Sequence, residues 1–375
     1  MTLHRFALIG CSGIAKKHAE SLRRIEGAEL AAVCDLNPSR AEEMGRAYGV
    51  PHYTRYEEML RSEPIDVVSV LTPSGDHARR VLDLVQYRKH IVVEKPMALR
   101  LEDADEMVEA CAAAGVRLFV VKQNRYNRPV QALRKALEAG RFGKLVLATV
   151  RVRWCRTQEY YAAAPWRGTW EHDGGVLTNQ ASHHVDLLTW MAGEVEKVSA
   201  MTSTRLVDIE TEDVATATLR FRNGALGIIE ATTATRPKDL EGSVSILGEK
   251  GSVVIGGFAM DRLLTWAFSE PQPEDARIFE THGENPGDFA WSHTEYLRGV
   301  VRSLQGKEAP LVHGLEGKKS IALIHALYES AETDRTVSLP CNPQRSRLGQ
   351  KSEPVSADVL IPRRRAVQWA SRLST

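Results

Sequence analysis

The chain lacks the marks of several large protein classes. Its five cysteines are scattered, odd in number and free of metal-type spacing, so we expect reduced thiols rather than a disulfide framework or a metal site. The formal net charge is only +1, which gives no field to attract nucleic acid or an anionic membrane. No apolar run approaches the roughly 20 residues of a spanning helix, and no signal-peptide pattern opens the chain. We therefore predict a cytoplasmic protein without nucleic-acid or membrane partners.

What is present is an ordinary globular composition arranged in two successive patterns. With 375 residues, 43% hydrophobic and 26% charged, the chain is long enough for two domains. Short apolar runs first alternate with helical patterns, which predicts right-handed crossovers and a parallel sheet. The predicted strands cover 5–10, 29–35, 65–71, 90–94 and 116–121, and the helices run from the first strand to 25 and over 38–48, 76–86 and 101–114. Residues 1–122 are therefore predicted to form a doubly wound, Rossmann-type nucleotide-binding domain.

The pattern changes after residue 122. Helices are predicted over 130–139, 177–191, 289–304 and 317–332, and strands over 145–153, 195–204, 213–221, 225–233, 242–247 and 251–255. Asn223-Gly224, between two of these strands, is a strong hairpin signal. Residues 123–340 are thus predicted to form an α+β domain on a large, open, mainly antiparallel sheet, whose uncovered face would serve a homodimer or homotetramer. We expect residues 341–375, with Arg363–Arg365, to be a surface tail.

A degenerate dinucleotide fingerprint follows the first predicted strand. Gly10 allows a tight turn, Ser12 stands where a second glycine usually lets the backbone approach a pyrophosphate, and Ala15 permits close packing of helix on strand. The helix N-terminus then offers backbone N–H groups to phosphate. A plain strand–turn–helix is the alternative, but a second strand follows the helix, as dinucleotide binding requires. The residues predicted to bind the cofactor here are Gly10, Ser12, Gly13 and Ile14.

Asp35 ends the second predicted strand, 25 positions after Gly10. A carboxylate at this place hydrogen-bonds the adenosine ribose and repels a 2′-phosphate, so it favours NAD over NADP. Arg40 lies nearby and could accommodate a phosphate. Asp35 could instead cap the next helix, but Asn37 can take that role. We predict that the cofactor is NAD.

Two further segments follow the third and fourth strands. Thr72-Pro73, with His77, and Glu94-Lys95-Pro96 lie at carboxyl ends of strands, where open α/β sheets place their ligands. A lysine after a strand is usually a solvated loop charge, but here an apolar strand delivers Lys95 into the expected cleft. Pro96 also restricts Lys95 to extended geometry. We predict that the cofactor contacts Thr72, Pro73, His77, Glu94 and Lys95.

The segment from Asp173 to Asp186 gathers polar groups in a predicted helix. Asn179 and His183 are four residues apart and would share one helix face, whereas His184 would point elsewhere. Adjacent histidines therefore do not predict a metal site, and Asp186 reads as a structural carboxylate. The pair Gly174-Gly175 would let a ligand approach the backbone. Arg125, at the junction of the predicted domains, is a candidate for the cleft wall.

Taken in order, these motifs resemble the glucose–fructose oxidoreductase / inositol dehydrogenase (Gfo/Idh/MocA) family. The resemblance covers about residues 4–340 and rests on the fingerprint, Thr72-Pro73, Glu94-Lys95-Pro96 and the segment from Gly174 to Asp186. It implies a Rossmann domain, an α/β domain with an open sheet used in oligomerisation, and NAD(P)-dependent chemistry on sugar and cyclitol hydroxyls. It also implies that Lys95 is the catalytic lysine and that His183 lies beside the reacting hydroxyl. Asn179 stands where many members carry aspartate.

A finer resemblance is to members that act on UDP-N-acetylglucosamine or its uronate as 3-dehydrogenases. It rests on the stretches 153–156, 160–161, 165–170 and 179–184. Tryptophan and tyrosine can stack on a sugar or base, and arginine can clamp a pyrophosphate or uronate. Trp154, Trp166 and Trp170 are equally readable as core, and the arginines as surface ion pairs. The predicted substrate-binding residues are Lys95, Arg156, Tyr160, Trp166, Arg167, Asn179 and His183.

The expected reaction is oxidation of the C3 hydroxyl of a UDP-N-acetyl sugar to a 3-keto sugar, with hydride passing to nicotinamide C4. The predicted catalytic residues are Lys95, His183 and Asn179. His183 is the preferred base because an imidazole has a pKa near working pH. Two alternatives stay open: a dehydrogenase of inositol or another free sugar or polyol, and a non-catalytic NAD-binding sensor or assembly subunit. Whether 2-oxoglutarate recycles the bound cofactor, as in some relatives, also stays open.

Overall fold

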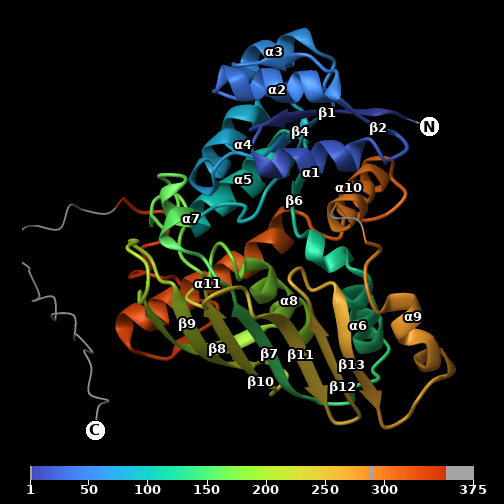
Figure 1. The fold of residues 1–375 in the computed structure, drawn as a ribbon, viewed down its shortest axis with the longest axis vertical. Coiled ribbons are helices and arrows are strands. Elements are labelled where there is room, and N and C mark those ends of the chain that lie inside the picture. The colour runs from blue at the N-terminus through green and yellow to red at the C-terminus, as the bar shows by residue number, and fades with distance from the viewer. Residues whose placement is uncertain (1, 288–289, 352–375) are drawn as a thin grey trace, which may run out of the picture.

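The chain forms two β-sheets of different kinds, seen here in a computed structural model that describes residues 2–287 and 290–351. Figure 1 shows the first sheet with its helices, in blue and teal, above the broad second sheet, in green and yellow. This arrangement confirms the predicted fold class. Where one domain ends and the next begins remains a prediction.

The first sheet has six parallel strands in the order β3-β2-β1-β4-β5-β6. The chain alternates strand and helix through this part, as the sequence predicts. The sequence did not predict β3 and α3, because a two-residue strand and a short helix give little periodicity. The bounds are β1 (His4–Ile9), α1 (Gly13–Leu22), β2 (Ala28–Cys34), α2 (Pro38–Tyr48), β3 (His52–Tyr53), α3 (Tyr56–Ser62), β4 (Val67–Val70), α4 (His77–Val85), β5 (His90–Val93), α5 (Leu101–Ala113) and β6 (Leu118–Val120).

Helix α2 shows how local signals set the bounds. The side chain of Asn37 accepts hydrogen bonds from the backbone N–H groups of Ser39 and Arg40, and Pro38 takes the first helical position. Gly49 ends the helix in the left-handed conformation, with φ of 70°. Residues at the two ends of the helix determine where it begins and ends, so the observed helix coincides with the predicted range 38–48.

The second sheet has eight strands in the order β13-β12-β11-β7-β10-β9-β8-β14. Its neighbouring strands are antiparallel except for β10 and β7, so it is the mainly antiparallel sheet that was predicted. The Asn223-Gly224 turn joins β9 to β10, with Gly224 at φ of 91°. The strands are β7 (Leu145–Arg153), β8 (Val195–Ser203), β9 (Val214–Phe221), β10 (Leu226–Thr232), β11 (Glu241–Gly248), β12 (Gly251–Gly256), β13 (Arg262–Phe268) and β14 (Val337–Ser338).

Within residues 2–287 and 290–351, helices pack against one face of this sheet and leave the other open. Helix α8 contacts β7 and β11, and α11 contacts β8, while Met201, Leu226 and Ile228 are exposed on outward positions of β8 and β10. No helix among the described residues is long and apolar enough to cross a bilayer. The remaining helices are α6 (Arg128–Glu138), α7 (Gln158–Ala162), α8 (Ser182–Ala192), α9 (Ile278–His282), α10 (Trp291–Leu304) and α11 (Gly314–Thr333).

Late segments of the chain complete the core of the first sheet. Helix α10 packs against α1, and its Tyr296 and Leu297 are buried together with Phe6 and Leu8 of β1. Helix α11 contacts α5 and β6. The first sheet therefore depends on residues that lie far beyond the stretch where its strands are encoded.

Helix α8 begins five residues later than predicted, at Ser182 instead of residue 177. The backbone N–H groups of Val176 and Leu177 donate to the main-chain and side-chain oxygens of Glu212, so this stretch forms turns. Asn179 thus precedes the helix. The prediction that Asn179 and His183 share a helix face is wrong for this reason.

Part of the predicted C-terminal tail packs firmly on the second domain. Leu348 is buried in the core of the larger sheet, and Gly349 N donates to the Trp170 carbonyl at 2.8 Å. His325 hydrogen-bonds Ser346 at 2.8 Å. Residues 352–375, including Arg363–Arg365, lie outside the described residues.

Candidate active site

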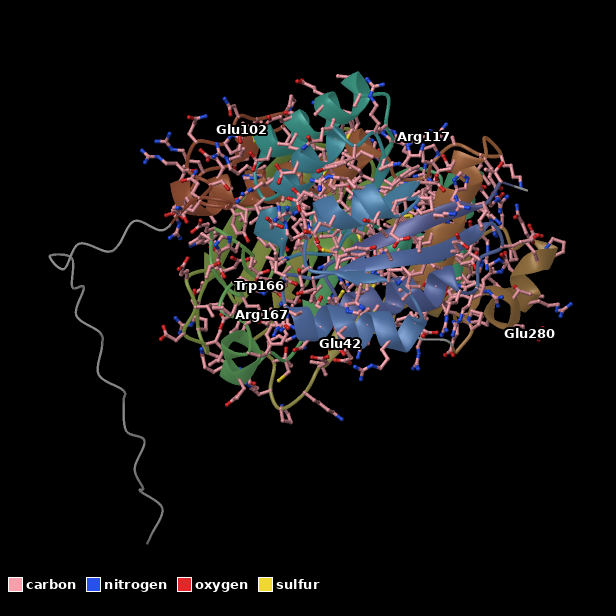
Figure 2. The ribbon with its side chains drawn as sticks, turned by 90° about the horizontal axis from the view of Figure 1, so that it is seen from above. Glu42, Glu102, Arg117, Trp166, Arg167 and Glu280 are labelled. Atoms are coloured by element: carbon pink, nitrogen blue, oxygen red, sulfur yellow. The ribbon has the colours of Figure 1, made fainter. Side chains whose placement is uncertain are left out.

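A cavity of about 1270 Å³ runs along the carboxyl ends of the first sheet's strands. One wall comes from the loops that follow β1, β2, β4 and β5. The segment after α7 closes it from the other side, where Gly75 N donates to the His172 carbonyl at 3.0 Å. Figure 2 shows Trp166 and Arg167 next to each other on that segment. From this side the lining residues are Ala163, Ala164, Trp166, Arg167, His172 and Asn179.

The glycine turn after β1 has the geometry of a phosphate cradle. Gly10 has φ of 99°, and a Cβ on it would lie 2.6 Å from the Leu71 carbonyl oxygen, so only glycine fits. Ser12, Gly13 and Ile14 line the cavity at the start of α1, whose N-cap residue Ser12 makes no side-chain capping bond. The free N–H groups of the first turn can therefore serve an anionic ligand. The residues present fit a dinucleotide.

Asp35 lines the cavity beyond the end of β2 and is half-buried. Its carboxylate accepts hydrogen bonds from Cys11 N at 2.7 Å and Asn37 N at 2.8 Å. It thereby ties the glycine turn to the loop after β2. Each carboxylate oxygen can accept a further bond, so Asp35 remains able to receive a ribose hydroxyl.

His77 links two loops of the cavity. Its Nδ1 lies 2.7 Å from the Pro96 carbonyl and its Nε2 2.9 Å from the Thr72 carbonyl. Burial lowers its pKa, although these two carbonyls act in the opposite direction. Thr72, Pro73 and His77 all line the cavity as predicted positions, but the His77 ring is occupied by the protein itself. We assign His77 a part in holding the loops together.

Glu94 lies behind Lys95 in a buried group with two histidines. His18 Nε2 is 3.1 Å from Glu94 Oε1, and Lys95 N donates to Glu94 Oε2 at 3.0 Å. Burial disfavours the charged carboxylate, but the His18 hydrogen bond and the nearby His293 outweigh it and lower the pKa of Glu94 to about 2. Side-chain nitrogen and oxygen atoms of His18, Glu94 and His293 lie within 4.8 Å of one another. The spacing in the sequence does not indicate this group, because its members come from α1, the loop after β5, and α10.

Lys95 connects the loop after β5 to the segment from Asp173 to Asp186. Its Nζ donates to the Asn179 carbonyl at 2.8 Å, and the Asn179 side-chain amide donates to the Asp173 carboxylate. Burial lowers the pKa of Lys95, while the charges of Glu94 and Asp173 act against that shift. Lys95 and Asn179 both line the cavity. The structure thus brings together two of the three predicted catalytic residues.

His183, the third, lies in the first turn of α8 and is not among the residues that line the cavity. Its Nε2 is 3.1 Å from Nε2 of Gln123, and its Nδ1 has no hydrogen-bond partner among the described residues. Burial, followed by the positive charges of Lys95 and Lys122, lowers the pKa of His183 well below its usual value. The ring is therefore neutral at neutral pH and can accept a proton. Sequence reasoning did not single out Gln123, since the contact spans 60 residues.

Arg125 and Asp186 form a buried anchor. Two Arg125 nitrogens, Nε and Nη2, each donate to Asp186 at 2.8 Å, and Lys122 Nζ lies 3.7 Å from the same carboxylate. Arg125 is 1% exposed, so the prediction that it faces the cleft is wrong: the buried carboxylate holds it inside. Asp186 is structural, as predicted. His184 is also buried and lies edge-on to Trp154 at 5.7 Å.

The pair Gly174-Gly175 leaves room for the side chain of another residue of the protein, Glu212. A Cβ on Gly175 would lie 2.0 Å from Oε2 of Glu212, and one on Gly174 would meet Thr178. The expectation that this pair lets a ligand approach the backbone is wrong, because Glu212 fills the space. Burial raises the pKa of Glu212 to about 7.

Two members of an aromatic and arginine cluster, Trp166 and Arg167, line the cavity, whereas the predicted Arg156 and Tyr160 do not. The guanidinium carbons of Arg156 and Arg167 lie 5.4 and 4.2 Å from the centre of the Tyr160 ring. Arg156 also pairs with Asp239 at 3.1 Å, whereas Arg167 lines the cavity and its Nη1 donates to the Tyr160 carbonyl. Trp166 is half-buried in the lining. Trp154 and Trp170 are core residues, which settles that alternative.

Two family descriptions match nearly the whole chain. Residues 4–122 match "Oxidoreductase family, NAD-binding Rossmann fold", and residues 134–339 match "Oxidoreductase family, C-terminal alpha/beta domain" of the Gfo/Idh/MocA group. A myo-inositol 2-dehydrogenase of Thermotoga maritima is 29% identical over 343 residues, which span 89% of this chain and 98% of that protein.

Two solved structures are more similar. The WlbA dehydrogenase of Bordetella pertussis, in complex with NADH and UDP-GlcNAcA, is 45% identical, with a TM-score of 0.88 over 91% of this chain and 99% of that one. The WlbA dehydrogenase of Chromobacterium violaceum, with the same two ligands, is 43% identical, with a TM-score of 0.85 over 91% of this chain and 97% of that one.

Proposed function

The chain belongs to the Gfo/Idh/MocA family of NAD-dependent oxidoreductases, and from this premise we propose that its substrate is a UDP-N-acetyl sugar, either UDP-N-acetylglucosamine or its uronate. The proposed reaction oxidises the C3 hydroxyl to a ketone. The observation that carries the proposal is that Trp166 and Arg167 line the same cavity as the glycine turn. The similarity to two dehydrogenases solved with NADH and UDP-GlcNAcA supports it.

Arg167 is suited to an anionic substrate. Its Nη1 bonds only a carbonyl, its Nε has no partner among the described residues, and its charge faces the cavity. A guanidinium binds phosphate or carboxylate through paired hydrogen bonds. Trp166, which also lines the cavity, offers a flat face for a sugar or a base. A small uncharged polyol would use neither feature.

In the proposed mechanism His183 is the general base. Its neutral imidazole takes the hydroxyl proton, and the Gln123 amide, 3.1 Å from Nε2, orients the ring. Lys95, fixed by the Asn179 carbonyl, stabilises the negative charge that develops on the substrate oxygen. Bound NAD supplies the hydride acceptor.

A dehydrogenase of inositol or another free polyol is the second candidate. It is favoured by the 29% identity to the myo-inositol 2-dehydrogenase of Thermotoga maritima over nearly the full length of both proteins. The same lysine and histidine would serve that reaction. The two candidates differ in what Arg167 contacts.

A binding panel separates these candidates. We expect the NAD-loaded protein to be stabilised by UDP-N-acetylglucosamine or its uronate, by about 2.7 kcal/mol at a concentration of 100 Kd, and not by myo-inositol. Thermal unfolding measures this stabilisation. Absorbance of the reduced cofactor, followed with and without 2-oxoglutarate together with sugar-nucleotide products, measures turnover.

Arg167 provides the matched variant for the panel. We expect Arg167→Ala to weaken nucleotide-sugar binding by about ten-fold or more, because hydrogen bonds to charged groups contribute about 1.5–3 kcal/mol. Arg262→Ala removes an exposed arginine on β13 and should leave binding unchanged. Stabilisation by myo-inositol alone, insensitive to Arg167→Ala, would transfer the assignment to the second candidate.

Asp35 tests the cofactor choice. We expect Asp35→Ala to lower kcat/KM for NAD by about ten-fold or more, through loss of hydrogen bonds from the ribose to a charged acceptor. The loss for NADP should be smaller, because the repulsion of its phosphate disappears. The ratio of the two kcat/KM values cancels damage to the glycine turn, which Asp35 also holds. An unchanged ratio would remove Asp35 from cofactor selection.

We further propose that the protein is a homo-oligomer, dimer or tetramer, joined through the open face of the larger sheet. Met201, Leu226 and Ile228 are exposed there, and a large sheet needs its apolar face covered. Sedimentation that finds only monomer at micromolar concentration would contradict this proposal.

A further inference from the structure

We propose that Asp173 is a positioning residue that acts through Asn179 to hold the Lys95 ammonium in place and in its charged form. This inference rests on the proposed function for its catalytic meaning. Asp173 itself does not line the cavity, whereas Lys95 and Asn179 do. It would therefore act on the reaction without touching substrate.

The geometry is a three-residue chain across the domain junction. Lys95 Nζ donates to the Asn179 main-chain oxygen at 2.8 Å, and the Asn179 side-chain amide donates to Oδ1 of Asp173. Gly168 N donates to Oδ2 of Asp173 at 2.9 Å. Both oxygens of the carboxylate are thus occupied, and the Asn179 carbonyl is set for the lysine. Residues 176–180 form turns before α8, so no helix holds Asn179. This side-chain bond holds it together with its backbone N–H, which donates to the Gly175 carbonyl at 3.0 Å, and with Ser182 Oγ, which donates to the Asn179 carbonyl at 3.2 Å.

Asp173 also supplies a negative charge near Lys95, where the neighbouring Asn179 is neutral. It is 1% exposed, and burial raises its pKa to about 6, while Gly168 N–H, the Asn179 amide, Lys95 and Arg167 favour the charged form. At neutral pH the carboxylate is mostly ionised. Its charge counteracts the burial that lowers the pKa of Lys95. A neutral asparagine beside the lysine cannot do this, whereas the carboxylate directly behind it can.

Other charged groups face the same two residues. The charge of Glu94 affects the pKa of Lys95, and the charge of Lys95 affects the pKa values of His183 and Lys122. The charge of Arg167 likewise affects the pKa of Asp173, which in turn affects the pKa values of Glu212 and Tyr161. Titrations of any one group therefore include the others. The test must therefore measure the pKa of Lys95 itself, and it must compare variants in which these neighbouring charged groups are unchanged.

The experiment titrates Lys95 in the full-length protein without nucleotide sugar. Reductive methylation with ¹³C-formaldehyde labels lysines, Lys95→Arg identifies the Lys95 signal, and its chemical shift against pH gives the pKa. We expect Asp173→Asn to lower the pKa of Lys95, because the favourable negative charge is lost. The kcat of this variant should fall about 10–10²-fold, since a small displacement of a catalytic group is costly.

A swapped pair tests charge separately from shape. In the double variant Asp173→Asn/Asn179→Asp, the amide at 173 can donate to the carboxylate at 179 and still accept from Gly168 N. We expect this variant to restore the pKa of Lys95 to the original value or above it. Asp275→Asn removes a carboxylate bound by Arg141, away from the cavity, and should leave Lys95 unchanged.

The outcomes decide the proposal in each case. An unchanged pKa of Lys95 in folded Asp173→Asn overturns it, and so does a lowered pKa in the swapped pair. If Asp173→Asn does not fold, the swapped pair alone carries the comparison. The titration contains no substrate, so it gives the pKa of Lys95 whatever the substrate is. A protein that does not bind UDP-sugars would fail the binding panel, and the pKa of Lys95 could still be compared between the variants.

Discussion

Replacing His183 by alanine is expected to lower kcat by about 10²–10⁴-fold, the usual contribution of a general base. The fold should survive, because His183 is only partly buried and makes one side-chain hydrogen bond, to Gln123. NAD affinity should stay close to the original value, since the predicted dinucleotide residues lie on the first sheet. Steady-state rates, calorimetric NAD titration and thermal unfolding measure the three quantities.

The pH profile gives His183 a second, sharper readout. A base must be neutral to work, and burial with the charges of Lys95 and Lys122 lowers the pKa of His183 well below its usual value. In the original enzyme kcat/KM should therefore hold as pH falls through 6.5 and decline only well below it. His282→Ala, on α9, serves as the remote control. Turnover near the original rate in His183→Ala would end its assignment as base.

Lys95→Ala is expected to lower kcat by about 10²–10³-fold, as loss of an electrostatic group at the reacting oxygen does. Lys95→Met keeps most of the side chain's length and apolar stem without its charge, so it should be about as slow as alanine while unfolding at a similar temperature to the original. An added primary amine such as ethylamine should restore part of the turnover to Lys95→Ala by occupying the vacated space. It should not rescue His183→Ala.

This cross-comparison separates the two roles. Because Lys95 Nζ donates to the Asn179 carbonyl, its removal also breaks this contact between the loop after β5 and residues 173–186. Lys95→Ala is therefore expected to change KM for the sugar as well as kcat, whereas His183→Ala should act mainly on kcat. If both variants turned over near the original rate, the Lys95–His183 pair would have to be abandoned.

Local signals decided which parts of the fold could be predicted. Helix α2 is bounded by a cap residue, a proline and a terminal glycine that are all local in sequence, and its observed bounds match the predicted range 38–48. The start of α8 could not be placed, since it depends on Glu212, which lies more than thirty residues away and captures the preceding N–H groups. Strand β13 was missed because its residues show no clear alternation of burial.

The same division holds in the candidate site. Residues at the carboxyl ends of parallel strands, such as Gly10, Asp35 and Lys95, line the cavity because topology alone brings those ends together. Gln123 and Asp173 were not singled out, since their importance comes from contacts with His183 and Asn179. Arg125 was misplaced, because its sequence position at the junction says nothing of the buried Asp186 that holds it.

Helix α10 has a consequence for how the protein is made. The first sheet is encoded early, yet Tyr296, Leu297 and Val300 of α10 close the apolar core over Phe6 and Leu8. A nascent chain that has emerged only through β6 leaves that core uncovered, so the first sheet can bury it fully only after α10 has also been synthesised. A gene fragment that ends at residue 122 would encode the predicted dinucleotide-binding residues without α10, the helix that covers the apolar core beneath them.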